Sequence, residues 1–94
     1  MSTINNEAVS FLGTDTPVKI YNKNDSRTFL SLYSVSGSCY FNIGDNDFEK
    51  NARLLTDGDI WEPSKVPTSS IWFKGNNARL TALVGGDRPI VPFD

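Results

Sequence analysis

Carboxylates are the only side chains in this sequence whose spacing suits catalysis or metal binding. The 94 residues include no histidine and a single cysteine, Cys39. The lack of histidine removes the commonest general base and metal ligand, together with every Ser-His or Cys-His nucleophile. One cysteine excludes a thiolate zinc site and an internal disulfide, so the chain needs no oxidising compartment. We interpret Cys39 as a small buried hydrophobe, since it falls on the apolar side of an expected strand.

Two groups of acidic residues are close enough in sequence to be considered as sites. Asp45, Asp47 and Glu49 alternate within one polar segment, and Asp57 and Asp59 are separated by one glycine. Alternating acids can hold calcium through oxygen ligands, but the twelve-residue calcium-loop pattern is not met. A glycosidase pair needs two carboxyls about 5–9.5 Å apart across a cleft that so small a chain has little room to build. We favour solvated loops at both places, and therefore predict no catalytic residue, no metal and no cofactor.

Three aromatic residues, Tyr40, Trp61 and Trp72, suggest a different kind of site. They could form a platform on which a sugar ring stacks. Large exposed aromatic rings on a small domain more often mark a protein interface. Trp72 is flanked by Ile71 and Phe73, and a strand directs alternate side chains to opposite faces. We expect Ile71 and Phe73 in the core and the Trp72 ring on the outside.

Composition restricts the class of protein further. The formal charge is −2, the hydrophobic share is 38 % and the aromatic share is 12 %. These values are typical of a single globular domain, and the scattered Lys and Arg residues give no basic patch for nucleic acid or an anionic membrane. The N-terminus has no signal-peptide pattern, and no segment approaches the roughly 20 apolar residues of a membrane helix. We expect one domain over residues 1–94, with a flexible arm at 1–7, an extended tail at 86–94, and use in a cytosol-like compartment.

Short extended segments separated by turn residues must position these side chains. No segment shows an apolar period of 3.6 residues, whereas about eight short runs show strand patterns at roughly ten-residue spacing. The pattern predicts an all-β sandwich or jelly roll. The expected strands lie within Ala8–Leu12, Val18–Tyr21, Thr28–Val35, Cys39–Ile43, Ala52–Leu55, Ile60–Trp61, Ser70–Lys74 and Ala78–Val84.

The segment Thr28–Gly44 has the signature of an antiparallel hairpin, because two β-rich arms flank Ser36-Gly37-Ser38. In its first arm Leu30, Leu32 and Ser34 share one face, while Phe29, Tyr33 and Val35 share the other. An arm that is apolar on both faces belongs in the middle of a sandwich or beneath a partner chain. We therefore expect a homo-oligomer, a dimer or a trimer, or a monomer that is stable only on a larger shell.

Several short motifs resemble those of small structural proteins from tailed bacteriophage virions. They span about Asn22–Gly85 and comprise Asn24-Asp25-Ser26-Arg27, Phe41-Asn42-Ile43-Gly44, Leu54 or Leu55 before Asp57-Gly58-Asp59, Ser70-Ile71-Trp72-Phe73-Lys74-Gly75 and the final Arg79–Val84 strand. The resemblance implies an all-β domain without catalytic residues, such as the head decoration or cement proteins. It also implies subunits that pack on each other or on a capsid shell through exposed apolar faces and extended tails.

Together these observations lead us to expect a non-enzymatic virion protein. Its expected role is that of a decoration or cement protein that binds the major capsid protein or other virion subunits. Assembly would take place in the host cytoplasm. The expected interface residues are Phe29, Tyr33, Tyr40, Trp61, Trp72, Pro89 and Phe93. The alternative is a carbohydrate-binding module or receptor-binding tip that uses its surface aromatic residues, and an enzyme ranks third.

Overall fold

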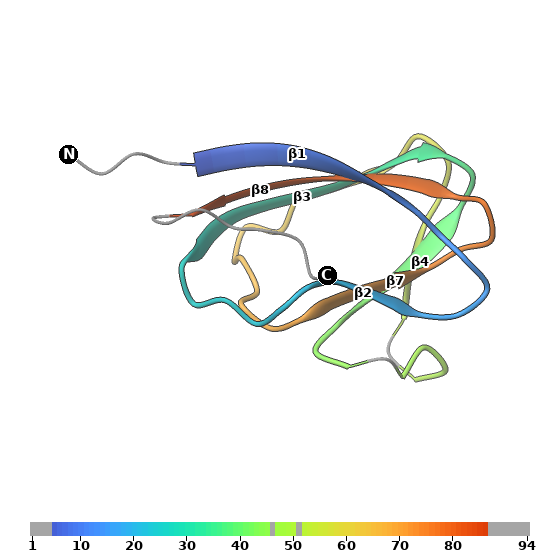
Figure 1. Ribbon diagram of the computed structural model, residues 1–94, viewed down its shortest axis with the longest axis horizontal. Coiled ribbons are helices and arrows are strands. Elements are labelled where there is room, and N and C mark those ends of the chain that lie inside the picture. Colours follow the sequence, from blue (N-terminus) through green and yellow to red (C-terminus); the bar gives the residue numbers. More distant parts are fainter. Residues whose placement is uncertain (1–4, 46, 51, 87–94) are drawn as a thin grey trace.

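The computed structural model describes residues 5–45, 47–50 and 52–86, with side chains from Ala8 onward. In these residues the chain forms eight strands and no helix, arranged as two antiparallel sheets of four strands (Figure 1). The prediction of an all-β sandwich of about eight short strands is confirmed. The strands are β1 (Asn5–Leu12), β2 (Val18–Tyr21), β3 (Arg27–Ser36), β4 (Cys39–Ile43), β5 (Arg53–Leu55), β6 (Ile60–Trp61), β7 (Ile71–Lys74) and β8 (Arg79–Gly86).

The order of the strands is that of a jelly roll. Sheet A has the order β1-β8-β3-β6, and sheet B has the order β2-β7-β4-β5. Figure 1 shows β1, β8 and β3 in one layer and β2, β7 and β4 in the other. Among the described strands, only β4 and β5 are both consecutive in the chain and paired in one sheet, while every other connection crosses between the layers. Such crossing connections are typical of double-sheet jelly rolls.

The predicted hairpin over Thr28–Gly44 is wrong, although both of its strands exist. β3 pairs with β8 and β6 in sheet A, whereas β4 pairs with β5 and β7 in sheet B. The turn between them, with Gly37 at φ 77°, carries the chain across the sandwich. The backbone of Ser34 bonds to Asp59 and Gly58 instead of to β4, at N···O distances of 3.0 and 2.8 Å. The local sequence, two apolar strands joined by a small turn, is compatible with a hairpin in one sheet or with a crossing between the sheets. The long pairing of β3 with β8 favours the crossing.

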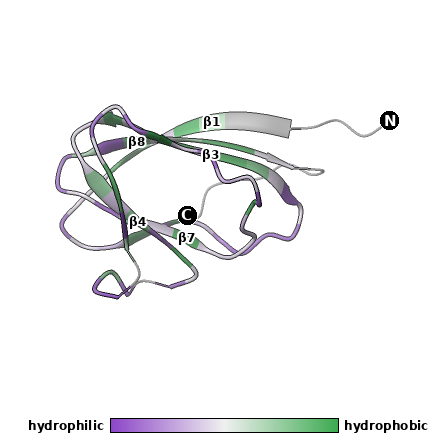
Figure 2. Ribbon diagram, turned by 180° about the vertical axis from the view of Figure 1, so that it is seen from behind, coloured by the Kyte–Doolittle hydropathy of each residue, from purple (hydrophilic) through white to green (hydrophobic). Residues whose placement is uncertain are grey.

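Side chains that alternate along the strands fill the space between the two sheets. In sheet A, Leu30 and Leu32 of β3 face inward beside Leu80, Ala82 and Val84 of β8, and all five are buried. Sheet B contributes Ile20, Tyr21, Cys39, Phe41, Leu55, Ile71 and Phe73. Coloured by hydropathy, the strands carry most of the hydrophobic segments and the connecting loops are mainly hydrophilic (Figure 2). The core assignment of Ile71 and Phe73 from their alternation is therefore confirmed.

Two local features adjust this packing. Phe11 of β1 contacts Tyr21 and Phe73 of the opposite sheet, with ring centroids 5.9 and 6.3 Å apart and edge-to-face geometry. Ile20 and Tyr21 are consecutive in the chain yet both buried. A register shift between Lys19 and Tyr21 explains this, because an irregularity in the ladder lets neighbouring side chains turn to the same face.

The first strand is longer than the sequence pattern predicts. β1 begins at Asn5 and pairs with β8 from the register Asn5↔Gly86, so residues 5–7 of the expected arm belong to a sheet. Gly86 likewise ends β8 instead of beginning a tail. No helix in the described ranges has the length and apolar character required to cross a bilayer.

Candidate functional site

The acids at Asp45–Glu49 build a turn. The Asn42 side-chain amide donates to the backbone carbonyl and the Oδ1 atom of Asp45, both at 2.8 Å. Asp45 Oδ1 also accepts from the Asp47 amide at 2.9 Å, and Asp47 Oδ1 accepts from the Glu49 and Lys50 amides at 3.2 and 3.3 Å. In the part of the chain that the structure describes, no three acidic, histidine or cysteine side chains group to hold a metal. The Asp45 and Asp47 carboxylates therefore serve as hydrogen-bond acceptors for backbone amides of their own loop.

The second acidic pair has a similar structural role. The Asp59 amide donates to the Thr56 carbonyl at 2.9 Å, and the Thr56 hydroxyl donates to an Asp59 carboxylate oxygen. Gly58 has φ 86°, a conformation that a side chain disfavours, and it forms a tight turn before β6. Asp59 therefore fixes the turn that enters sheet A.

The three aromatic residues considered as a platform do not come together. Tyr40 and Trp72 lie on the outer face of sheet B, where Asn42 pairs with Trp72 and Tyr40 pairs with Lys74. Trp61 lies at the edge of sheet A and packs toward the core, with its ring centroid 4.7 Å from that of Phe41. The sandwich thus separates Trp61 from the other two rings.

Trp72 is on the predicted face but is half-buried, not widely exposed. The Lys19 ammonium lies 5.4 Å from the centroid of its ring, and its indole Nε1 is buried without a hydrogen-bond partner among the described residues. Tyr40, at 47 % exposure, is the more accessible ring of this face. A contact through sheet B would therefore involve Tyr40 before Trp72.

The outer face of sheet A also carries exposed apolar side chains. Tyr33 pairs with Ile60 on one side and Thr81 on the other, and is 38 % exposed, while Ile60 is 59 % exposed. Further apolar side chains on this face come from β1, β3 and β8. We call the set the sheet A face: Leu12, Phe29, Tyr33, Val35, Ile60 and Leu83.

Sequence reasoning identified Phe29 and Tyr33 of this face but did not select Leu12, Ile60 or Leu83. Alternation along a strand could have placed Leu83 on the outer face, since it falls between the buried Ala82 and Val84. Alternation does not show which strands share a sheet, so the sequence could not bring these residues together on one face. The expected interface residues Pro89 and Phe93 lie outside the described residues.

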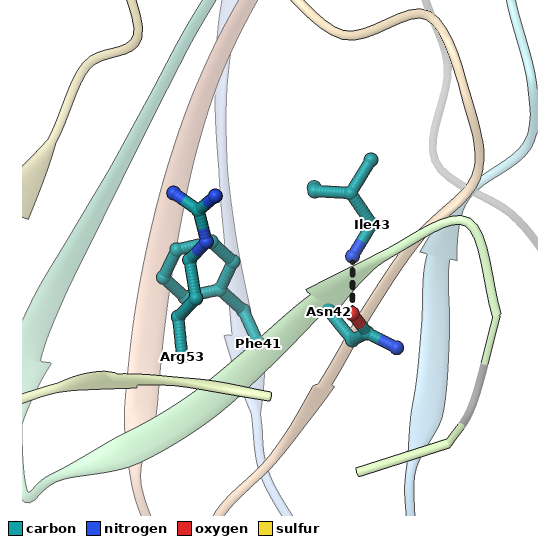
Figure 3. Close-up of a pocket in the computed structure, with 4 residues that line it drawn as sticks. All are labelled: Phe41, Asn42, Ile43 and Arg53. Carbon is teal, nitrogen blue, oxygen red and sulfur yellow. Dashed lines mark hydrogen bonds between the residues drawn. The ribbon is translucent and has the colours of Figure 1, made fainter. Parts of the chain in front are cut away.

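A pocket opens where the β4–β5 side of sheet B faces the edge of sheet A. It has a volume of about 490 Å³ and is lined by Ile43, Arg53, Trp61, Pro63, Ser64, Lys65 and Pro67. A second cavity of about 290 Å³ shares Ile43 and Arg53 and adds Phe41 and Asn42. Figure 3 shows Arg53 beside Phe41, and the Asn42 side-chain oxygen accepting from the Ile43 amide, a bond of 3.0 Å. Nothing in the sequence pattern had singled out Arg53 or Lys65.

Arg27 is a buried cation at the start of β3. It is 3 % exposed, and its guanidinium donates to the carbonyls of Pro67, Ser69 and Asn22 at 2.7, 3.0 and 2.9 Å. Burial lowers the pKa of Arg27, and the nearby Tyr21 opposes that shift. Its Nε has no partner among the described residues. Because all three acceptors are backbone carbonyls of connecting segments, Arg27 joins the β2–β3 and β6–β7 connections.

Cys39 is fully buried, as its alternation predicted. Burial raises the pKa of the Cys39 thiol, and a hydrogen bond with Ser34 partly offsets that effect. A raised pKa leaves the sulfur protonated and poorly nucleophilic at neutral pH. The geometry therefore suits a packing role for this residue.

Comparison with known proteins extends the description of the fold. A scan against protein-family models finds no match, and a search of curated proteins finds none either. The chain is similar to a Neisseria meningitidis protein of known crystal structure, with 18 % identity, a TM-score of 0.53 and coverage of 88 % of this chain and 74 % of that one. It is also similar to a protein of the Bacillus endospore appendages, which form disulfide-linked pili. That match has 10 % identity, a TM-score of 0.57 and coverage of 89 % and 86 %. At such identities these likenesses show a shared fold.

Proposed function

We propose that this chain is a non-enzymatic structural subunit of a larger protein assembly. Its more specific form is a virion protein of the head decoration or cement type, which binds a capsid shell or other virion subunits. In this role the domain associates with copies of itself or with neighbouring shell subunits. Assembly takes place in the host cytoplasm.

The sheet A face is the observation that carries the proposal. Its six residues come from four strands of one sheet, and Leu12, Tyr33, Val35 and Ile60 are exposed. Exposed apolar side chains gathered on one face of a small domain typically mark a protein interface. The opposite side of β3, with Leu30 and Leu32, already fills the core. A partner on the outer side would therefore bury β3 on both faces, as its two-sided apolar pattern suggests.

The likeness to a pilus protein supports the general form of this role. That neighbour belongs to appendages that form disulfide-linked pili, so a domain with this fold serves there as part of a polymer. Here the single cysteine of the sequence is buried in the core. Association through this domain would accordingly depend on apolar contact and not on a disulfide.

Mass spectrometry of purified virions from the source tests the specific form of the proposal. We expect peptides of this chain at a stoichiometry comparable to that of the shell subunits. Absence from the particles would exclude the virion role. Sedimentation of the purified chain tests the general form, for which we expect reversible association that increases with concentration.

The carbohydrate-binding alternative has less support from the geometry. Arg53 lies over the Trp61 ring at 5.6 Å, and Lys19 lies over the Trp72 ring, so Tyr40 is the most accessible candidate for stacking on a sugar. A glycan array together with tryptophan fluorescence titration tests it. Binding that is lost in Tyr40→Ala would favour this alternative over an assembly role.

A further inference from the structure

The pocket around Arg53 has a chemistry that the sheet A face lacks. We call it the Arg53 pocket, and its main lining residues are Ile43, Arg53, Trp61, Pro63, Lys65 and Pro67. Its volume of about 490 Å³ lies within the usual range of ligand sites, roughly 300–1,000 Å³. The adjoining cavity shares Arg53 and Ile43, which extends the concave surface along β4 and β5.

The charges of the lining have one sign. Among the residues that the structure describes, Arg53 and Lys65 are the charged ones of the lining, and none of the described residues that line either cavity is acidic. Glu62 precedes Pro63 in the chain but is exposed and is not part of the lining. Two cations without a carboxylate in the wall favour an anionic ligand. The remaining wall is mainly apolar, so that ligand should combine a carboxylate with apolar groups.

Arg53 is exposed, and its guanidinium lies over an aromatic ring. Its guanidinium carbon lies 5.6 Å from the centroid of the Trp61 ring, and Trp61 in turn packs on the core residue Phe41. A guanidinium carries its N–H donors around its edge, so stacking on a ring leaves these donors for a carboxylate.

The strands beside the pocket favour an extended peptide as the occupant. β5 pairs with β4 alone and β6 pairs with β3 alone among the described strands, so both are edge strands. Edge strands offer unpaired backbone groups to which an extended segment can add. A sugar is less suitable, because Arg53 already lies over the Trp61 ring.

We propose that the Arg53 pocket binds an extended acidic segment of a partner protein, with a carboxylate on Arg53 and Lys65 and an apolar neighbour against Ile43, Pro63 and Pro67. This inference rests on the proposed function, because it assumes that the chain binds a partner protein within an assembly. The pocket would be a second contact besides the sheet A face. Its test uses the isolated chain and short peptides. It can therefore fail while association through the sheet A face succeeds, and the reverse is also true.

The probe is the capped peptide acetyl-Glu-Thr-Ile-Thr-Glu-amide, in which Glu, Ile and Glu share one side of an extended chain. Its control has Gln in place of both Glu residues. Binding is measured by calorimetry, and by fluorescence in a Trp72→Phe background so that the signal reports Trp61. We expect the Glu peptide to bind about tenfold or more tightly than the Gln peptide, because charged hydrogen bonds are the stronger ones. Added salt should reduce this difference.

Matched variants locate the site. Arg53→Gln should remove the preference for the Glu peptide, whereas Arg79→Gln, an exposed arginine on β8, should leave it unchanged. Melting curves of both variants show that they remain folded. Equal binding of the two peptides, no binding at millimolar concentration, or a preference that persists in Arg53→Gln would overturn the inference. Tighter binding of an oligoglucuronate, lost in Arg53→Gln, would also overturn it in favour of an acidic sugar.

Discussion

The buried thiol of Cys39 should make the stability of the fold depend on pH. Its thiol is buried beside Ser34, and burial raises the pKa of Cys39 in the folded state. The folded protein therefore keeps this proton to a higher pH than the unfolded chain, whose thiol has a pKa of about 8.5. The stabilising contribution is complete below that pH and is lost as the pH rises through the folded-state value.

We predict that the free energy of unfolding falls above about pH 8.5 more steeply in the wild type than in Cys39→Ala. Urea denaturation of both proteins between pH 7 and pH 10 measures the difference, and subtraction removes the contribution of the lysine and tyrosine groups. Parallel curves would show that the thiol does not titrate differently in the two states. At neutral pH, Cys39→Ala should also lose some stability because it removes a buried group.

Trp72 and Phe73 are neighbours in β7 with opposite environments. Phe73 is fully buried and contacts Phe11, whereas Trp72 is half-buried on the outer face of sheet B. We predict that Phe73→Ala lowers the free energy of unfolding by roughly 3–5 kcal/mol through lost burial and a cavity. Trp72→Ala should cost less than about 2 kcal/mol, because only part of its ring leaves water on folding.

Chemical denaturation of the two variants measures this ranking, and weaker particle binding by Trp72→Ala would additionally mark an interface. A larger loss in Trp72→Ala than in Phe73→Ala would mean that β7 faces the other way.

At the scale of elements, the long connection between β6 and β7 needs something other than a strand ladder to hold it. Arg27 provides this through bonds to the carbonyls of Pro67 and Ser69, and a third bond reaches Asn22 after β2. The amide of Asn24 donates to Thr68 at 2.8 Å and strengthens the same junction. The side chain therefore acts on two connections far apart in the sequence.

We predict that Arg27→Ala destabilises the fold by about 3 kcal/mol or more, since three carbonyls lose a charged donor in a buried setting. Arg27→Lys should recover only part of this loss, because an ammonium lacks the planar fork that reaches several carbonyls. The control Arg79→Ala, at an exposed position, should stay within about 0.5 kcal/mol of the wild type. Equal urea midpoints for Arg27→Ala and Arg79→Ala would contradict the role of Arg27.

For the molecule as a whole, we expect the two outer faces of the sandwich to contribute differently to assembly. Tyr33 lies on the sheet A face between Ile60 and Thr81, and Tyr40 lies on the outer face of sheet B between Leu54 and Lys74. The two tyrosines are 38 % and 47 % exposed, which makes them a matched pair for substitution. A difference between them therefore reports the face and not the residue type.

We predict that Tyr33→Lys weakens self-association or shell binding by a factor of ten or more, corresponding to about 1.4 kcal/mol or more, because a charge would be buried in an apolar contact. Tyr40→Lys should change it much less. Analytical ultracentrifugation over a range of concentrations, with a particle-binding assay, measures both. A monomeric wild type that also fails to bind particles would remove the sheet A face as an interface.

The strands and their buried faces were largely predictable from the sequence. Cys39, Ile71 and Phe73 were assigned to the inside by alternation alone, and the structure buries all three. The period of two follows from the local geometry of an extended backbone, so it does not depend on which strands become neighbours. The turns at Gly58 and Asn77 have positive φ, a conformation that Gly and Asn adopt more readily than other residues.

Pairing between strands was decided only by the tertiary structure. β3 could have folded back on β4, but it pairs with β8, whose residues lie about fifty positions further along the chain. The Arg53 pocket depends on the same choice, because it places Arg53 of β5 beside Trp61 of β6 and Lys65 of the next connection. The burial of Arg27 also requires the distant carbonyls of Pro67 and Ser69. Such contacts are non-local, and one extended segment carries the same alternation whichever partner it receives.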